Sequence, residues 1–513
     1  MRRRTERRRI ELPTMFSMLE MRPASYNPGS YNRDSITLAQ REWAALPVSA
    51  RVAVIRRLRR IIASGARELA ETIPASLPGA LDRTVADSLI AEVLPLLEAC
   101  RFLEREGEVL LRPRRIGSEG RPLWLGSVEA EVERVPWGTV LVLAPSNYPL
   151  LLAGVQTVQA LVAGNAVLWK PAPGTETPAT ALRLLLIEAG LPSELLTVLH
   201  PGVIAAQEAI AAGVDHVVLT GSAESGKAIA HQLAETLTPA TMELSGCDAV
   251  FLLPGFDRDH SIEALLFGQR FNGSATCMAP RRLFLVGLSD AETDAVEGQL
   301  KETMTALPRV AVTPAMEARL RELVEDARVQ RAQIVCDGLA GAGSGYVGAT
   351  LIFDAQPLLR AMQADIFAPL LSVMRVADQD EALAAHAACP YALTASIFGP
   401  EEQARKLACR LRMGNVLINN LIIPTADPRI PFGGRGRSGF GVTRGAEGLL
   451  AMTTPRTTQI DRRPMRRAYE PTRAEHADLF AALAQVLHGA GLRQRLGAAL
   501  RLIRSGRKLS RKP

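Results

Sequence analysis

The sequence predicts an α/β fold in which a parallel sheet is covered by helices on both faces. From residue 135 onward, short apolar runs alternate with helical stretches, and each connection is long enough to hold a crossover helix. A chain of 513 residues is also too long for one small core, so we expect two or three domains. A hydrophobic content of 47% and a charged content of 22% are ordinary for a soluble globular protein.

The elements follow in order along the chain. Residues 37–73 have a helical pattern, in which apolar side chains recur among arginines. Strands are then expected at 139–144, 166–169, 195–199, 216–219 and 241–244. Helices are expected near 151–163, 178–189, 204–212 and 224–236. Strands and helices that alternate at this spacing indicate parallel βαβ units in a doubly wound sheet.

The apolar stretch 148–169 is long enough to cross a membrane. It contains Gln156, Gln159 and Asn165, and Pro145 and Pro149 stand at its entry. A buried helix followed by a buried strand therefore explains it better.

Residues 123–134 interrupt the αβ alternation. Val128, Ala130 and Val132 would face one side of a strand and the intervening glutamates the other, which predicts part of a projecting hairpin. A second α/β region follows over 246–446, and 451–460 is expected to form a closing strand. Exposed strand edges favour self-association, and we expect a homodimer or homotetramer.

The formal charge of +7 comes largely from the two ends of the chain. Nucleic-acid binding by the folded body therefore does not follow from it, and an aromatic content of 4% gives no stacking surface. Six well-separated cysteines without a CxxC pair suit free thiols in a reducing compartment. The N-terminal arginines precede no apolar signal segment, so a cytoplasmic protein is expected. No metal site is expected.

Four segments can carry chemistry, although each also has a plain structural explanation. Asn147 lies in a proline-bracketed turn after a strand, where its amide could bind an oxyanion or simply cap the turn. Lys170 ends the next strand, as a ribose or phosphate ligand or as a solvated charge. Residues 219–228 join a strand to a helix start through Gly221, Ser222 and Gly226, which suits a phosphate or an ordinary helix cap.

The fourth segment pairs an acid with a thiol. Glu243 ends a strand, and Cys277 lies in the small polar loop 271–279. A lone cysteine is usually a small core residue, and a strand-end glutamate is usually solvated. The functional alternative is a nucleophile with a nearby base.

Taken together, these four segments resemble the aldehyde dehydrogenase superfamily over about residues 37 to 460. The Asn-to-Lys and Glu-to-Cys separations fit that family, as does the late sequence 430–439, Ile-Pro-Phe-Gly-Gly-Arg-Gly-Arg-Ser-Gly. The resemblance implies a Rossmann-type cofactor domain, an α/β catalytic domain and a small β oligomerisation element. It places the cofactor domain at 15–120 and 137–243 and the catalytic domain at 244–446. The oligomerisation element would comprise 121–136 and 447–462, between a basic arm at 1–14 and a basic helical tail at 463–513.

The resemblance also implies the chemistry. Cys277 would attack the aldehyde as a thiolate, and the Asn147 amide and the Cys277 backbone N–H would hold the resulting oxyanion. A thioester would follow after oxidation by NAD or NADP, and Glu243 would activate the water that releases a carboxylic acid. The cofactor residues implied are Lys170, Gly221, Ser222, Gly226, Asp365, Phe367 and Phe432.

Two departures from the family pattern concern the cofactor. Pro173 stands where many NAD-preferring relatives have a glutamate that repels a 2′-phosphate, so NADP use becomes plausible beside NAD. Asp365, in Asp-Ile-Phe-Ala-Pro at 365–369, is one methylene shorter than the family's glutamate that holds the nicotinamide ribose.

Two alternatives remain. One is an acylating aldehyde dehydrogenase, or an acyl-phosphate or acyl-CoA reductase, against which Glu243 speaks. The other is a non-catalytic family member that acts as a binding or scaffold protein, which would be expected to have lost Cys277, Glu243 or Asn147.

The C-terminal tail repeats leucines at helical spacing, and arginines join them toward the end. This pattern predicts an amphipathic helical stretch. The stretch either packs on its own body or on a partner subunit, or it makes peripheral contact with an anionic membrane surface. The second alternative would suit an apolar, lipid-derived aldehyde.

Overall fold

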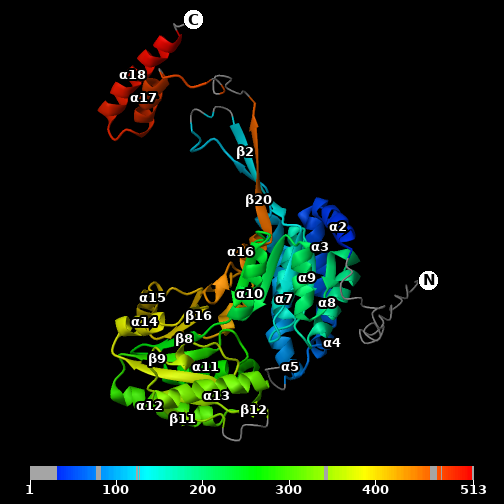
Figure 1. The fold of residues 1–513 in the computed structure, drawn as a ribbon, viewed down its shortest axis with the longest axis vertical. Helices are drawn as coiled ribbons and strands as arrows, with labels where there is room; N and C mark the ends of the chain where they lie inside the picture. The colour runs from blue at the N-terminus through cyan, green and yellow to red at the C-terminus, as the bar shows by residue number, and fades with distance from the viewer. Residues whose placement is uncertain are drawn as a thin grey trace, which may run out of the picture. The chain divides into compact units, whose positions relative to one another are not determined.

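A computed structural model describes residues 32–76, 83–122, 125, 128–339, 345–462, 469, 471–474 and 476–510 of the chain. The basic arm expected at 1–14 lies outside these residues. The chain divides into a larger compact unit, residues 1–113 and 133–456, and a smaller one, residues 114–132 and 457–513. Both predicted α/β regions fall in the larger unit, each with its own sheet (Figure 1).

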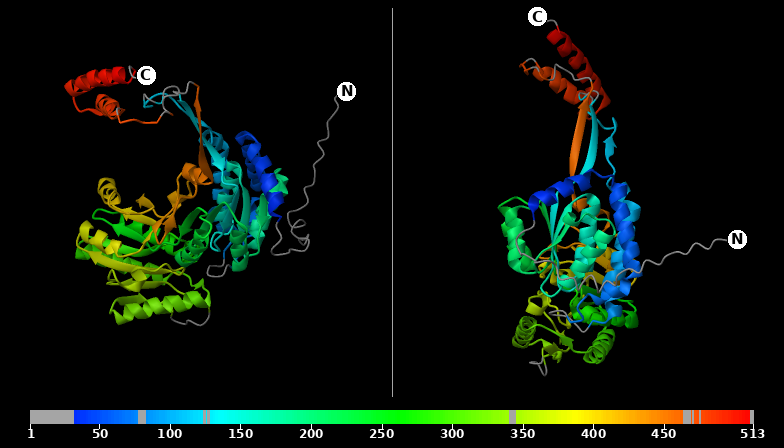
Figure 2. Two further views of the ribbon diagram at one scale, coloured as in Figure 1. Left: turned by 45° about the horizontal axis from the view of Figure 1, so that its top comes forward. Right: turned by 90° about the vertical axis from the view of Figure 1, so that its right-hand side faces the viewer.

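The helical pattern predicted at 37–73 is confirmed, and the region is divided into three helices: α2 (Arg33–Ala45), α3 (Val48–Ser64) and α4 (Ala66–Glu71). The ring of Pro47 excludes Leu46 from helical geometry, and Leu46 is extended at φ −68° and ψ 146°. Gly65 separates α3 from α4. After α5 (Val85–Ser88) and a π-helical turn, η1 (Leu89–Val93), the chain forms α6 (Leu94–Leu110). In Figure 2 these blue helices lie against the cyan and green part of the larger unit, with which they share one apolar core.

The first sheet contains six strands in the order β19-β7-β6-β3-β4-β5, and β19 alone runs antiparallel to its neighbour. Its strands are β3 (Thr139–Leu143), β4 (Ala166–Lys170), β5 (Leu196–Val198), β6 (His216–Gly221), β7 (Ala240–Leu244) and β19 (Gly439–Phe440). The crossover helices are α7 (Leu151–Ala163), α8 (Glu176–Glu188), α9 (Val203–Ala212) and α10 (Ala223–Ala234). The five strands and four helices predicted in this region are thus confirmed, within a few residues at their ends.

This strand order creates a switch point in the sheet. From β3 the chain builds outward through β4 and β5, and it then returns to the other side of β3 to add β6 and β7. The loops after β3 and β6 therefore diverge above a gap between neighbouring strands, which is where open α/β sheets bind ligands.

The apolar stretch 148–169 forms α7 and β4, as predicted, and nearly every residue of α7 is buried. In the part of the chain that the structure describes, no helix combines the length and apolar character needed to cross a membrane.

The second sheet has seven strands in the order β11-β13-β14-β9-β8-β16-β17, parallel except at β11. They are β8 (Asp248–Leu252), β9 (Pro280–Val286), β11 (Gln333–Cys336), β13 (Thr350–Phe353), β14 (Leu370–Val376), β16 (Thr394–Phe398) and β17 (Asn415–Ile418). The accompanying helices are α11 (Arg258–Arg270), α12 (Asp290–Thr305), α13 (Pro314–Val329), α14 (Gln379–Ala387) and α15 (Glu401–Ala408). A further helix, α16 (Gly445–Ala451), packs instead on α6 and α7, in the core of the first sheet. Successive residues of β8 point to opposite faces of the sheet, so Phe251 and Leu252 enter two separate apolar cores.

Short strands and 3-10 turns complete this unit. They are β10 (Val310–Ala311), β12 (Tyr346–Val347), β15 (Tyr391–Ala392), β18 (Arg435–Gly436), η3 (Ser193–Leu195), η4 (Phe271–Ser274), η5 (Arg360–Met362) and η6 (Ile423–Ala426).

The predicted hairpin and closing strand are both present. β1 (Arg114–Ile116) pairs antiparallel with β2 (Val128–Pro136), and β20 (Thr453–Asp461) completes a three-stranded sheet. The helical stretch predicted for the tail is present as two helices, α17 (His476–His488) and α18 (Leu492–Ser510), with Gly489 and Gly491 between them.

Candidate active site

The loop that carries Cys277 follows α11 and has an irregular backbone. Asn272 and Ser274 adopt left-handed φ values of 51° and 65°, which are uncommon for residues other than glycine. The Asn272 side chain offsets this strain, because its Nδ2 donates to the carbonyls of Asn147 at 3.1 Å and Ala275 at 3.2 Å. The loop is thereby held against the turn that follows β3.

The backbone at Gly246 lies close to this loop, because glycine has no Cβ. A Cβ at this position would lie 2.8 Å from the carbonyl oxygen of Cys277 and 2.6 Å from Oδ1 of Asp248. A glycine just after β7 is therefore needed for the nucleophile loop to pack over the strand end.

Cys277 is half-exposed and its thiol is a weak acid in this environment. Burial raises the pKa of Cys277 well above the usual range, and the negative charges of Glu243 and Asp248 raise it further. The Arg444 guanidinium acts in the opposite direction. The net effect of these surroundings disfavours the thiolate form of Cys277.

Glu243, in β7, points into the same region. Its Oε2 accepts a hydrogen bond of 2.7 Å from the Thr443 hydroxyl, whereas its buried Oε1 has no protein partner in the described structure. Burial raises the pKa of Glu243, and the charge of Arg444 partly offsets this effect. An unpartnered oxygen on a carboxylate of raised pKa is suited to accept a proton from a bound molecule.

Asn147 lies just beyond the carboxyl end of β3. Its Nδ2 donates to the Ala275 carbonyl at 2.9 Å, and its Oδ1 accepts from the Tyr148 backbone N–H at 3.1 Å. An amide nitrogen carries two N–H groups, so one donor remains after the contact with Ala275.

A cavity of about 220 Å³ opens at the switch point of the first sheet. It brings together most of the predicted site residues: Asn147, Gly221, Ser222, Glu243, Cys277, Asp365 and Phe367.

Ser222 is the N-cap of α10 and accepts from the Ser225 backbone N–H at 3.2 Å. The positive end of the α10 dipole therefore faces this cavity, which fits a phosphate group. Asp365 accepts a hydrogen bond of 3.0 Å from the Tyr391 hydroxyl.

Three predicted cofactor residues do not line this cavity. Lys170 is half-buried at the end of β4, and burial lowers its pKa. Gly226 lies in the first turn of α10, where a Cβ would meet Leu244 Cδ1 at 2.6 Å, so this glycine permits helix–strand packing. The ring of Phe432 is buried under the Arg444 guanidinium, 4.7 Å from its centroid.

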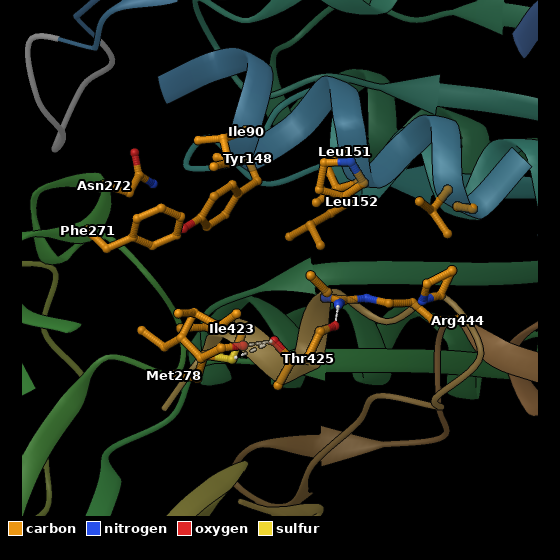
Figure 3. A pocket seen from close by; sticks show the side chains of 18 of the residues that line it. Ile90, Tyr148, Leu151, Leu152, Phe271, Asn272, Met278, Ile423, Thr425 and Arg444 are labelled. Atoms are coloured by element: carbon orange, nitrogen blue, oxygen red, sulfur yellow. Dashed lines mark hydrogen bonds between the residues drawn. The ribbon is translucent and has the colours of Figure 1, made fainter. Parts of the chain in front are cut away.

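A second, larger cavity of about 640 Å³ reaches Cys277 from the other side. Figure 3 shows Tyr148, Leu151 and Leu152 along one wall and Met278, Ile423 and Arg444 along the opposite wall. Cys277 lines both cavities, so one sulfur is accessible from two separate binding spaces.

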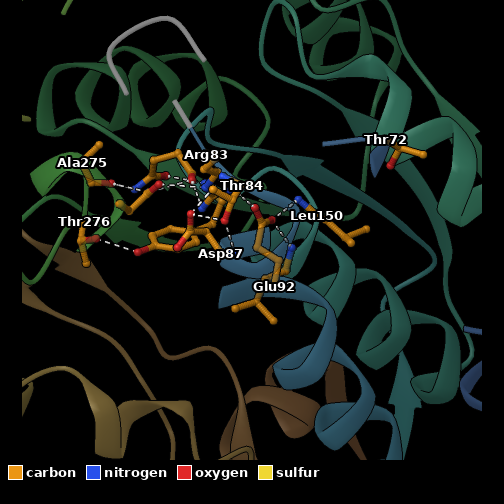
Figure 4. Close-up of polar contacts among 12 residues, drawn as sticks. Thr72, Arg83, Thr84, Asp87, Glu92, Leu150, Ala275 and Thr276 are labelled. Atoms are coloured by element: carbon orange, nitrogen blue, oxygen red, sulfur yellow. Dashed lines mark hydrogen bonds and ion pairs between the residues drawn. The ribbon is translucent and has the colours of Figure 1, made fainter. Parts of the chain in front are cut away.

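A buried ion pair joins the turn after β3, the loop that carries Cys277 and the start of α7 (Figure 4). Arg83 pairs with Glu92, and it also donates to Asn272 Oδ1 at 3.0 Å and to the Asn147 carbonyl at 3.2 Å. Glu92 accepts from the backbone N–H groups of Leu150 at 2.7 Å and Leu151 at 3.0 Å, at the start of α7.

The sequence analysis missed Arg83, Glu92, Asn272 and Arg444 as parts of the site. Arg83 and Glu92 lie in a stretch that matches no motif, so nothing local distinguishes them. Asn272 and Arg444 stand near recognised motifs, but only the tertiary contacts reveal what they bind.

Comparison with known proteins gives an independent view of the chain. A sequence model described as "Aldehyde dehydrogenase family" matches residues 33–458. The succinate-semialdehyde dehydrogenase [NADP(+)] of Deinococcus radiodurans is 32% identical over 430 residues, which cover 81% of this chain and 86% of that protein. The 4,4′-diapolycopene aldehyde oxidase of Methylomonas sp is 29% identical over 457 residues, which cover 87% of this chain and 84% of that protein.

Solved structures agree on the fold. The NADP-dependent glyceraldehyde-3-phosphate dehydrogenase of Bacillus halodurans, complexed with NADP, superimposes with a TM-score of 0.75 at 25% identity. The match covers 83% of this chain and 90% of that one.

Proposed function

The chain belongs to the aldehyde dehydrogenase family, and we propose that it oxidises an aldehyde to a carboxylic acid with NAD or NADP as the acceptor. The observation that carries this proposal is the position of Cys277 at the junction of two cavities. A substrate in the larger cavity and a cofactor in the smaller one would meet at the same sulfur.

In this proposal Cys277 first releases its proton to water, and the thiolate then attacks the aldehyde carbon and forms a thiohemiacetal. The free N–H of the Asn147 amide and the Cys277 backbone N–H hold the oxyanion. NAD or NADP, when bound, takes up the two electrons of the oxidation as a hydride. The acyl group then remains on Cys277 as a thioester.

Glu243 distinguishes hydrolysis from acyl transfer to another acceptor. Its unpartnered Oε1 is available to take a proton from water, and its raised pKa makes it a stronger base than an ordinary carboxylate. We therefore propose release of the free acid rather than transfer to phosphate or coenzyme A.

The residues of the smaller cavity fit a pyridine dinucleotide. Ser222 and Gly221, at the start of α10, suit the pyrophosphate, and Asp365 suits a ribose hydroxyl. Pro173 is exposed and carries no charge that would repel a 2′-phosphate. The relative from Deinococcus is named as an NADP(+) enzyme, which supports including NADP.

The test is an assay of reduced cofactor and acid product with a panel of aldehydes and both NAD and NADP, without phosphate or coenzyme A. Acid formation is expected from wild type and from a Cys409→Ala control at an exposed thiol, but not from Cys277→Ala. A product that appears only with coenzyme A or phosphate would favour the acylating alternative. No reaction with any aldehyde would favour the scaffold alternative.

We further propose that α18 contacts an anionic membrane surface. Leu492, Leu496, Leu500 and Ile503 form a stripe at helical spacing, and their exposed fractions range from 53% to 79%. The helix contains several arginines and no acidic residue. An exposed apolar stripe on a basic helix favours the surface of an anionic bilayer.

We also propose self-association as a homodimer or homotetramer in the cytoplasm. In the three-stranded sheet as described, β1 and β20 form the two edges, and most of β20 is exposed. All six cysteines are free, which supports a reducing compartment. Light scattering that gives the mass of a single chain would contradict the oligomer.

A further inference from the structure

We propose that the larger cavity selects bulky, uncharged, apolar aldehydes. This inference rests on the proposed function, because it assigns a substrate class to the cavity that leads to Cys277. It goes further, since an aldehyde dehydrogenase can act on short, polar or charged aldehydes.

The size of the cavity is the first argument. Its volume of about 640 Å³ lies in the range of sites that enclose drug-sized ligands. A four-carbon aldehyde would leave most of this space to water. Its walls include Phe102, Leu103, Leu151, Val155 and Phe271, which offer no hydrogen bonds to hold such water.

The second argument concerns the charges around the cavity. Arg83 is buried, and each of its guanidinium nitrogens already donates, to Glu92, Asn272 or the Asn147 carbonyl. Arg444 stacks on Phe432 and donates to the Thr425 carbonyl at 2.7 Å.

The remaining charged groups of the wall are exposed. Asp87 caps α5 through Thr84, and the Arg270 side chain is exposed to solvent. Among the described wall residues, the one fully buried cation, Arg83, has no guanidinium nitrogen left for a carboxylate on the substrate, and half-buried Arg444 is partly engaged by Thr425 and Phe432. A carboxylated aldehyde would lose much of its hydration in this apolar cavity with little compensation.

The opening of the cavity is also apolar. Ile90 and Ile423 line the cavity, and their exposed fractions are 64% and 59%. Figure 3 places Ile90 and Ile423 on opposite walls. An apolar substrate would therefore remain in contact with apolar side chains as it enters.

The experiment measures kcat/KM of the full-length enzyme, with saturating cofactor, for butanal, hexanal, decanal and 4-oxobutanoate. Each buried methylene contributes about 0.8 kcal/mol, which corresponds to roughly a fourfold rise. We expect a rise on the order of 100-fold from hexanal to decanal. We also expect 4-oxobutanoate to be no better than butanal.

Equal values for hexanal and decanal, or a preference for 4-oxobutanoate over butanal, would overturn the substrate class while leaving aldehyde oxidation in place. Failure with every aldehyde would instead overturn the proposed function, and the inference with it.

Two variants test the walls directly. Ala99→Leu fills part of the cavity, and Ile423→Lys places a charge at its opening. Each is expected to lower the decanal-to-butanal ratio of kcat/KM by roughly tenfold. In Ala99→Leu the long substrate loses apolar contacts for lack of space, and in Ile423→Lys a bound apolar chain desolvates the new cation. Leu358→Lys, at a residue that is 75% exposed outside the cavity, is the matched control and should leave the ratio unchanged. An unchanged ratio in both wall variants would contradict the inference.

Discussion

Burial raises the pKa values of both Cys277 and Glu243, and it has opposite consequences for their chemistry. It disfavours the thiolate of Cys277, which is the form that would attack in the proposed reaction. It makes Glu243 a stronger base, because a carboxylate that is poorly solvated gains more from taking up a proton. Burial therefore disfavours the charged form of both groups, which lowers the thiolate content of Cys277 and favours proton uptake by Glu243.

The oxyanion contact gives the first prediction at the residue scale. Asn147→Ala removes one side-chain donor, and we expect kcat to fall by about 10²–10³-fold, as for other oxyanion donors. Steady-state kinetics on folded protein measures the effect. Asn165→Ala is the matched control, because buried Asn165 donates to the carbonyls of Ala160 and Met452, remote from Cys277. This control should lower stability but not kcat, and equal kcat values for the two variants would contradict the role of Asn147.

The raised pKa of Glu243 gives the second prediction. A carboxylate must be ionised to accept a proton from water, so thioester hydrolysis should slow as pH falls through the pKa of Glu243. An ordinary glutamate has a pKa near 4.5. Because the pKa of Glu243 is raised above this value, the rate should begin to decline at a higher pH than it would with an ordinary glutamate. Single-turnover measurements of acid release between pH 5 and 9 give the rate of thioester hydrolysis at each pH. A rate that is constant down to pH 5 would be inconsistent with Glu243 as the base.

At the scale of elements, α7 depends on contacts from outside its own sequence. Glu92 accepts two backbone N–H groups at the start of α7, where no side chain of the preceding turn provides a cap. Its partner Arg83 holds the turns that contain Asn147 and Asn272. One buried ion pair thus joins the cofactor-side helix to the nucleophile loop.

Breaking this pair should be costly. Glu92→Gln leaves Arg83 buried without its counter-charge, and we expect the free energy of unfolding to fall by about 3–5 kcal/mol. Denaturant unfolding gives the value. The control is Glu401→Gln, which breaks an exposed pair with Arg405 and should cost at most about 0.5 kcal/mol. Similar losses in the two variants would argue against a structural role for the buried pair.

Local patterns predicted the elements of the first sheet well, because its strands and helices alternate strongly. They predicted the helical character of 37–73 but did not place the break at Pro47, because the helical periodicity continues across it. They gave no sign of the π-helical turn that holds Glu92, because its geometry depends on the buried partners of that residue. The motifs identified the residues that line the smaller cavity, but the larger cavity is assembled from α6, α7 and η6 and has no continuous motif.

At the scale of the whole molecule, Cys277, the proposed nucleophile, lines two cavities. The smaller cavity uses strand ends and a helix N-terminus of the first sheet, and the larger one uses apolar helix faces.

The tail gives the prediction at this scale. The full-length protein should co-sediment with vesicles that contain phosphatidylserine but not with pure phosphatidylcholine, and added salt should weaken the binding. Reversal of two charges on α18, in Arg501→Glu/Arg504→Glu, should weaken binding at least about tenfold. The control, Arg405→Glu/Lys406→Glu on α15, reverses two exposed charges away from the tail and should bind like wild type. Equal binding of both variants would rule out α18 as the contact.

The most direct test of the central claim is a single turnover of Glu243→Gln with aldehyde and cofactor, analysed by mass spectrometry of the intact protein and its peptides. Oxidation without hydrolysis should leave the acyl group on Cys277, in an amount equal to the reduced cofactor formed, while wild type returns to its unmodified mass. Release of the acid by Glu243→Gln at the wild-type rate, or an acyl group on any residue other than Cys277, would contradict the account.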